Sequence, residues 1–303
     1  MSTPDTRIYW IHALSPLRIG VEEGLDAINL PTMREVHTGH PLVPGSSVKG
    51  VLRGEMDDKK EDVNGIFGPD RALAGDYRGG LGITDATLVA LPVRSLVGTF
   101  AWVCSQVTLR RLQRHRQSAG RHALPEALLG DDAKVARVCT GSALLRDGRI
   151  YVEEFEQGAE ENAALDKAAQ LLAEEIWPGD EGTQRFFRQR LLLTQNSVFD
   201  ALARNSLELR TRVCIDGTTG TAADSGPWTE EAMPAETLLA GLVVGRATTV
   251  VKRGEREELG TERQLSGGEA IGFMSERWGQ GGVLRMGGHT SIGFGRAWFR
   301  MVE

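Results

Sequence analysis

The sequence predicts an α+β fold, in which strand-forming and helix-forming segments contribute to a shared core. Three observations lead to this class. Residues 7–14 mix aromatic and β-branched side chains as strands do, and residues 160–177 repeat apolar side chains at helical spacing. Residues 207–251 hold two strand-like runs around a segment rich in turn residues. Both kinds of segment therefore carry apolar surface that has to be buried.

The composition is that of a globular protein whose contacts with nucleic acid have to be local. The chain has 303 residues, enough for one large domain or two ordinary ones, and 41% of them are hydrophobic. Its formal charge of -6 and pI near 5.7 argue against a protein that attracts nucleic acid through a positive field over its whole surface.

The cysteines and the first residues indicate a reducing compartment. Cys104, Cys139 and Cys214 are odd in number, far apart and without CxxC or Cys/His spacing, so neither a disulfide framework nor a zinc site is predicted. The opening residues lack a cationic and then apolar signal segment, and no apolar run approaches the ~18 residues of a membrane span. We expect a cytoplasmic protein with no membrane partner.

A long connection follows the first strand, over residues 21–45. It has no convincing periodicity, and a loop of this length in a compact domain is typically functional or disordered. Its density of charged residues and histidines favours function. His37 and His40 have no third partner at ligand spacing, so we interpret them as hydrogen-bonded loop residues and predict no metal there.

A helix should begin where this connection ends, at the paired serines. Pro44 and Gly45 precede Ser46 and Ser47, either of which is a favoured first cap. A helix N-terminus with two hydroxyl groups is an anion site in outline, and phosphate is the expected anion.

The same helix has an apolar stripe and a cationic face. Val48, Val51 and Leu52 repeat at helical spacing, whereas Lys49 and Arg53 lie four apart on another face. The alternative is an ordinary capped helix with solvated basic residues.

The middle of the chain alternates between the two kinds of segment. The residues predict strands at 81–92, 93–103 and 148–156, helices at 106–118 and 160–177, and short helical or mixed segments at 183–193 and 197–206. The helix at 106–118 carries four arginines, which we interpret as a solvated face in preference to an RNA contact.

Two strand-like runs, 207–215 and 236–251, predict a long hairpin with a projecting tip. The segment between them is rich in Gly, Thr, Ser and Pro. Arg210, Arg212 and Arg246 make the hairpin locally basic, and Trp228 either offers an aromatic plane to a nucleobase or anchors the hairpin to the body.

The C-terminal part predicts a helix at 268–278 and two strands, 283–286 and 295–302, joined by a Gly-rich loop. Glycines at positions 287, 288, 293 and 295 permit close approach of a ligand to the backbone, and Arg285, His289 and Arg296 flank them. The spacing matches neither a phosphate-binding NTPase loop nor a dinucleotide-binding fingerprint.

Taken together, these pieces resemble the repeat-associated mysterious protein (RAMP) superfamily, and within it the repeated backbone subunits of type III-B (Cmr) CRISPR effector complexes. Five stretches in the same order carry the resemblance: HALSPLRIG at 12–20, LPTMREVHTGHPLVPGSSVKGVLR at 30–53, ITDATLVALPVRSLVGTFAWV at 83–103, RVCIDGTTGTA at 212–222 with WTEEAMPAETL at 228–238, and GGHTSIGFG at 287–295.

The resemblance implies one RAMP domain over residues 1–303, with a palm like an RNA-recognition motif (ferredoxin-like) and an inserted β-hairpin thumb at about 207–250. It implies that copies of the chain stack along a CRISPR RNA, together with other Cmr-type subunits, and position a complementary target RNA. The residues it places on RNA are Ser46, Ser47, Lys49, Arg53, Arg34, Arg210, Arg212, Arg285, Gly287, Gly288, His289 and Arg296.

The chemistry of the family is where this sequence departs from it. In active relatives the subunit cuts target RNA with a divalent metal, Mg²⁺ or Mn²⁺, and the catalytic aspartate lies two residues before the proline of the LPxxRE-like motif. Asn29 stands at that position, naturally or by engineering. A neutral amide neither accepts the proton of a 2′-hydroxyl nor holds a metal well, so we expect strongly impaired cleavage and no stably bound cofactor.

Two alternatives stay open. The chain is an active metal-dependent RNA endonuclease if Asp26 or Glu230 supplies the missing carboxylate. It is a metabolic enzyme if the helix at 46–53 binds a phosphorylated small molecule instead of RNA.

Overall fold

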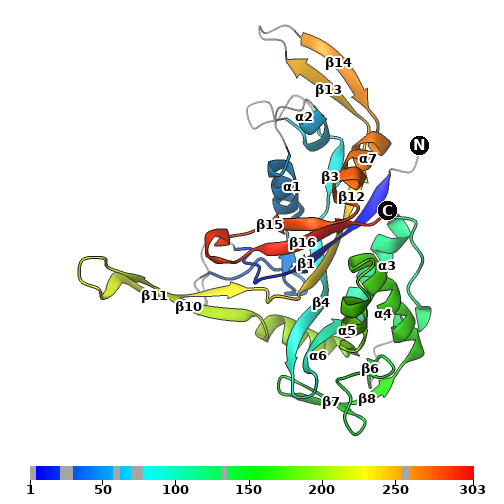
Figure 1. Ribbon diagram of the computed structural model, residues 1–303, viewed down its shortest axis with the longest axis vertical. Helices are drawn as coiled ribbons and strands as arrows, with labels where there is room; N and C mark the ends of the chain where they lie inside the picture. Colours follow the sequence, from blue (N-terminus) through cyan, green and yellow to red (C-terminus); the bar gives the residue numbers. More distant parts are fainter. Residues whose placement is uncertain (1–4, 21–29, 57–61, 70–77, 131–134, 254–258) are drawn as a thin grey trace.

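The computed structural model describes residues 5–20, 30–56, 62–69, 78–130, 135–253 and 259–303. Within these residues the strands form one twelve-stranded sheet and two separate two-stranded hairpins, and helices cover both faces of the sheet (Figure 1). The prediction of a mixed fold of strands and helices is confirmed.

The first strand, β1 (Thr6–Ala13), lies in the interior of the sheet, between β12 (Leu238–Gly245) and β16 (Arg296–Met301). Its side chains alternate between two cores, with Tyr9 and Ile11 in one and Ile8 and Trp10 in the other. The strand therefore has to be apolar throughout. Gly241, opposite Tyr9, leaves room for the tyrosine ring, since a Cβ there would lie 2.5 Å from the ring.

The remaining strands of the sheet extend on both sides of β1, mostly antiparallel to their neighbours. The order along the sheet is β15 (Gly282–Arg285), β16, β1, β12, β4 (Ala86–Ser95), β5 (Thr99–Ser105), β9 (Leu191–Thr194), β6 (Ala136–Val138), β8 (Phe155–Glu161) and β7 (Arg149–Val152), with β2 (Leu42–Val43) paired to β4 and β3 (Leu81–Ile83) paired to β12.

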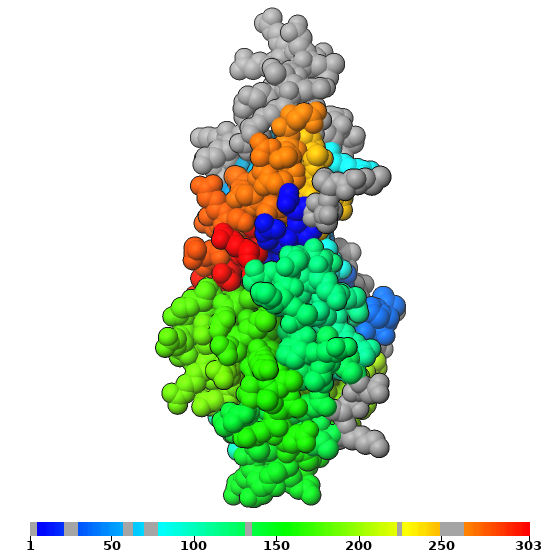
Figure 2. All heavy atoms as spheres, turned by 90° about the vertical axis from the view of Figure 1, so that its right-hand side faces the viewer, coloured from blue at the N-terminus to red at the C-terminus, as the bar shows by residue number. Residues whose placement is uncertain are grey.

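The helices divide between the two faces. One core takes apolar side chains from α1 (Gly45–Gly54), α2 (Asp62–Phe67), α6 (Asn196–Asn205) and α7 (Gly267–Trp278), and the other from α3 (Gln106–Ser118), α4 (Ala163–Ile176) and α5 (Glu181–Arg188). Figure 2 shows the α3 to α5 side, in green, below α7 in orange. No helix among the described residues is long and apolar enough to cross a membrane.

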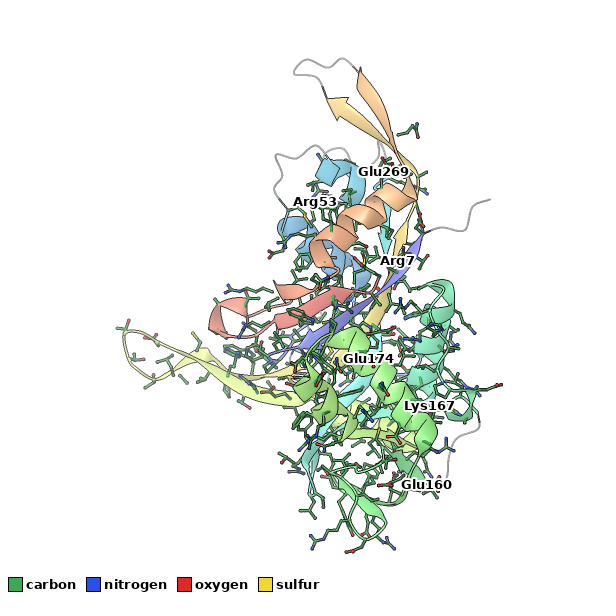
Figure 3. The ribbon with its side chains drawn as sticks, turned by 45° about the vertical axis from the view of Figure 1, so that its right-hand side comes forward. Arg7, Arg53, Glu160, Lys167, Glu174 and Glu269 are labelled. Atoms are coloured by element: carbon green, nitrogen blue, oxygen red, sulfur yellow. The ribbon has the colours of Figure 1, made fainter. Side chains whose placement is uncertain are left out.

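The apolar face predicted for the helix at 160–177 is confirmed. Leu165, Leu172 and Ile176 are buried in α4, whereas Lys167 and Glu174 lie on its outer side (Figure 3). The helix begins at Ala163, later than predicted, because β8 continues to Glu161 and the side chain of Asn162 caps the helix.

The prediction of a solvated basic face on the helix at 106–118 is wrong for two of its arginines. Arg116 is 1% exposed and its Nη1 lies 2.8 Å from Glu175, which is also buried. Arg111 pairs with Glu35 at 3.0 Å. The acidic partners lie 59 and 76 positions away in the chain, so local charge patterning could not reveal them.

The predicted hairpin pairs different strands from those expected. β10 (Glu208–Ile215) pairs with β11 (Ala222–Ala232), not with residues 236–251. The latter run divides into β12, which is buried on both faces inside the sheet, and β13 (Thr248–Arg253), which pairs with β14 (Leu259–Leu265) in a second hairpin. Gly226 and Pro227 suggested a loop, but an isolated two-stranded ribbon tolerates proline within a strand.

Two runs predicted as continuous strands contain turns. β4 and β5 are separated at residues 96–98, where Gly98 has a φ of 80°, and β7 and β8 turn at Glu153, with a φ of 47°. In the first case a Cβ at position 98 would lie 2.8 Å from the Ala143 oxygen, so the turn requires glycine.

Candidate nucleic-acid interface

Helix α1 begins at Gly45, one residue before the predicted start, and neither Ser46 nor Ser47 caps it. The Gly45 amide donates to Asp85 Oδ1 at 2.8 Å, so a carboxylate from the β3–β4 connection takes the capping position. The prediction of a serine cap is therefore wrong. Because Asp85 already lies in the positive potential of the helix end, α1 attracts a phosphate less strongly than its sequence indicates.

Lys49 and Arg53 face other parts of the protein. Lys49 Nζ lies 3.4 Å from the Leu81 oxygen, and burial lowers the pKa of Lys49, with smaller contributions from the charges of Arg53 and Arg246. Arg53 donates to the Gly68 oxygen at 2.5 Å and to Asn64 Oδ1 at 2.6 Å, beside α2 (Figure 3). The two cations thus join α1 to its neighbours.

A cavity of about 430 Å³ lies where residues 18–20, the start of α1 and the Gly-rich loop meet. It is lined by Arg18, Ile19, Gly20, Leu30, Ser47, Gly287 and Gly288. The Gly288 amide donates to the Arg18 oxygen at 2.9 Å, and a Cβ on Gly287 would lie 2.3 Å from the same oxygen. The structure therefore brings the start of α1 and the Gly-rich loop together, with Arg18 between them. Arg18 was not predicted as a site residue, although it lies in the HALSPLRIG stretch.

Glu230 is the centre of an adjoining charged cluster. Its carboxylate accepts from Trp228 Nε1 at 2.8 Å and lies 3.0 Å from His289 Nε2, 2.7 Å from Arg212 Nε and 3.9 Å from Arg18 Nε. Burial opposes ionisation, but the Trp228 hydrogen bond and the positive charges of His289, Arg212 and Arg18 together lower the pKa of Glu230. The cluster ties the hairpin to the Gly-rich loop.

The hairpin arginines also contact the same loop. The guanidinium carbon of Arg210 lies 4.5 Å from the centre of the Phe294 ring, and that of Arg212 lies 5.3 Å from it. Arg210 also pairs with Glu208. Of the two roles considered for Trp228, its hydrogen bond to Glu230 supports the anchoring one.

Arg285 and Arg296 lie directly opposite each other on β15 and β16, and both are exposed. Neither guanidinium has a hydrogen-bonding or ionic partner within the described part of the chain. Like charges at opposite positions of an antiparallel pair destabilise it by a few tenths of a kcal/mol to about 1 kcal/mol. An anion between them would remove that repulsion.

Arg34, which the resemblance placed on RNA, is surrounded by protein acceptors. It donates to the oxygens of Gly39 at 2.7 Å and Ala203 at 2.9 Å, and to Glu231 Oε1 at 2.6 Å. Its contacts hold the 30–43 connection against α6 and β11. His40, interpreted as a hydrogen-bonded loop residue, bonds to Asp200 at 2.8 Å, and burial lowers the pKa of His40.

Asn29 and Asp26 lie outside the described residues. The next residue, Leu30, donates its amide to the Thr229 oxygen at 3.1 Å and accepts from the Glu231 amide at 3.0 Å. Within the described residues no group of three His, Cys, Asp or Glu side chains could hold a metal ion. The carboxylate of Glu230 is surrounded by cationic and N–H groups, which do not fit a divalent metal.

Comparison with known proteins identifies a family whose model spans almost the whole chain. The family model described as the RAMP superfamily matches residues 10–299. A relative named CRISPR system Cmr endoribonuclease Cmr4, from Pyrococcus furiosus, is 28% identical in an alignment of 299 positions that covers 94% of this chain and 92% of that protein.

Solved structures resemble the fold over nearly its full length. A crystal structure of oligomeric Cmr4 from Pyrococcus furiosus matches with a TM-score of 0.71 and 21% identity, over 100% of this chain and 99% of that one. A chain in a cryo-EM structure of type III-B Cmr-beta bound to cognate target RNA matches with a TM-score of 0.73 and 19% identity, over 98% and 96% of the two chains. Since the family model spans almost the whole sequence, the chain belongs to the RAMP superfamily.

Proposed function

We propose that the chain is a repeated backbone subunit of a type III-B CRISPR ribonucleoprotein, in which it binds the CRISPR RNA and positions a complementary target RNA. The observation that carries the proposal is the convergence of Arg18, Ser47, Gly287 and Gly288 around one cavity beside the base of a projecting hairpin. A hydroxyl group, backbone groups and a guanidinium that lie close together can bind the sugar and phosphate groups of an RNA strand.

In this proposal the twelve-stranded sheet and its helices are the palm, and hairpin β10–β11 is the thumb. The RNA backbone runs past the cavity and over the exposed pair Arg285 and Arg296. Lys49, Arg53 and Arg34 act mainly by holding the binding surface in shape, because their cationic groups already contact protein. A few local contacts per subunit, repeated along the strand, are compatible with a chain of net charge -6.

Co-expression with a CRISPR array tests the proposal directly. The purified chain should carry RNA of defined length, with an absorbance ratio at 260 and 280 nm above that of protein alone. A protein free of RNA, monomeric and binding a phosphorylated metabolite would contradict the proposal and favour the small-molecule alternative.

Replacing Arg285 and Arg296 together with alanine should weaken guide RNA binding about tenfold or more near 0.1 M salt. Each lost phosphate contact should also lower the slope of log K against log salt concentration by about 0.7. Filter binding or fluorescence anisotropy over a salt series measures both quantities. The matched control is the double variant Arg94→Ala with Arg146→Ala, whose side chains are 73% and 71% exposed on another part of the surface. Equal effects in the two variants would refute an RNA contact at Arg285 and Arg296.

We assign Glu230 to holding the hairpin against the Gly-rich loop, not to proton transfer. Since its pKa is lowered in the folded protein, its stabilising effect is present above its ordinary pKa of 4.5 and is lost as pH falls through the folded value. The difference in unfolding free energy between the wild type and Glu230→Gln should therefore shrink as pH falls below 4.5 and vanish once Glu230 is protonated in the folded protein. Urea unfolding at a series of pH values checks this, and a difference that grows towards low pH would contradict it.

Cleavage of the target is proposed to be strongly impaired, because Asn29 stands where active relatives have an aspartate. Glu230 is a poor substitute, since Arg18, Arg212 and the hydrogen bond from Trp228 stabilise its ionised carboxylate and make it a weak base.

A further inference from the structure

A second cavity, of about 760 Å³, lies on the opposite face of the sheet from the cavity lined by Arg18, Ser47 and Gly288. Its walls come from the end of β1, from β5 and β16, and from α5 with the residues before it. Aromatic side chains dominate these walls: Phe100, Trp102, Trp177, Phe186 and Trp298. This volume and an aromatic lining are typical of a small-molecule site.

The rings are set at steep angles to one another. The centre of the Trp102 ring lies 4.7 Å from that of Phe100, with an interplanar angle of 69°, and 6.2 Å from that of Trp177, at 55°. Trp102 itself is 1% exposed, so the ring surface open to a ligand comes mainly from the partly exposed Phe100, Trp177 and Trp298. A space lined by such rings attracts a cation through the quadrupoles of the rings.

One carboxylate is held at the edge of this space in a conformation that costs energy. Glu236 has a φ of 74°, which is unfavourable for a residue with a Cβ, by about 1–2 kcal/mol. Its amide donates to the Ala13 oxygen at 2.7 Å, and its own oxygen accepts from Trp102 Nε1 at 2.8 Å. The backbone is thus fixed on both sides, which is the pattern expected where strain serves a site.

Among the described residues no lysine or arginine pairs with the carboxylate of Glu236, whose partner is His12. His12 Nδ1 accepts from Trp177 Nε1 at 3.3 Å, so His12 Nε2 carries the proton that it donates to Glu236 Oε2 at 2.7 Å. Asp180 adds a second carboxylate, and the lining contributed by the described residues includes no lysine or arginine.

We propose that this cavity binds an organic cation of the alkylated ammonium class, with Glu236 as the counter-charge and Phe100, Trp177 and Trp298 as the aromatic walls. A metal ion fits less well. Within the described lining the carboxylates are those of Glu236, which already accepts from His12, and Asp180, which caps α5. The proposal does not rest on the RNA function, although Trp298 in the cavity wall lies on the same face of β16 as Arg296.

Choline and 3,3-dimethyl-1-butanol are the probes, because they share a shape and differ in charge. Titration of each into the full chain, followed by tryptophan fluorescence and calorimetry, should show saturable binding of choline. The neutral alcohol should bind at least about tenfold more weakly. Equal binding of the two, or no choline binding up to about 50 mM, would overturn the proposal.

Glu236→Gln keeps an acceptor for His12 but removes the charge, so it should weaken choline binding about tenfold. Phe100→Leu should weaken it several-fold by removing one aromatic wall. Glu181→Gln, an exposed change in the first turn of α5 that does not line the cavity, is the matched control and should leave affinity unchanged. Equal losses in Glu236→Gln and Glu181→Gln would also overturn the proposal, since they would indicate general charge attraction.

Discussion

Replacing Asn29 with aspartate is expected to raise the rate of target RNA cleavage by the assembled complex about 10²–10⁴-fold. An aspartate at this position can accept the proton of the attacking 2′-hydroxyl or contribute to metal binding, whereas the amide does neither well. The measurement is single-turnover cleavage of labelled complementary RNA by the guide-loaded complex with Mg²⁺ or Mn²⁺. Products should be spaced regularly, because each copy of the subunit cuts once.

Two controls separate this effect from a change in charge. Asn29→Gln keeps a neutral amide and should remain inactive. Asn205→Asp adds a carboxylate at the end of α6, on an exposed residue, and should also remain inactive. A wild-type complex that already cleaves as fast as Asn29→Asp would refute the proposed impairment and support Asp26 or Glu230 as the catalytic carboxylate.

Replacing Arg34 with alanine should lower the free energy of unfolding by about 3–5 kcal/mol. The substitution leaves Glu231, whose side chain is 3% exposed, as a buried charge without its arginine. It also removes the donors to the oxygens of Gly39 and Ala203. Urea unfolding followed by circular dichroism measures the loss.

Arg34→Lys should recover only part of this stability, because an ammonium group cannot reproduce the planar fork that reaches several acceptors. Arg149→Ala is the control, since that arginine pairs with Glu156 where both side chains are more than half exposed. Its loss should stay below about 1 kcal/mol. Equal losses for Arg34→Ala and Arg149→Ala would contradict the structural role of Arg34.

The spacing of apolar residues predicted those helices and strands whose buried faces depend only on residues close by in the sequence. The helix at 163–176, the first strand and the two C-terminal strands follow patterns that are complete within ten or fifteen residues. The pairing of the hairpins could not be obtained in this way. β12 and β13 form one apolar run in the sequence, and only the partners of β12 in the sheet separate them.

The candidate site was predicted in part. The Gly-rich loop, the hairpin arginines and Ser47 were identified, and the structure brings them close to one another. The sequence did not indicate which arginines and lysines already have hydrogen-bonding partners inside the protein. Arg34 and Arg53 resemble free cations in the sequence because their acceptors are backbone oxygens and distant side chains. Arg18 was missed because a single arginine in a turn carries no pattern.

The position of β1 in the middle of the sheet has a consequence for synthesis of the chain on the ribosome. Its neighbours are β12 and β16. The edges of β1 can therefore be paired only after residues 238–245 and 296–301 have been synthesised. At about 5–20 residues per second this interval lasts roughly 15–60 s. During that time an apolar segment, TRIYWIHA, has both backbone edges open. Aggregation during translation, more than unfolding of the finished protein, is therefore the main hazard for its production.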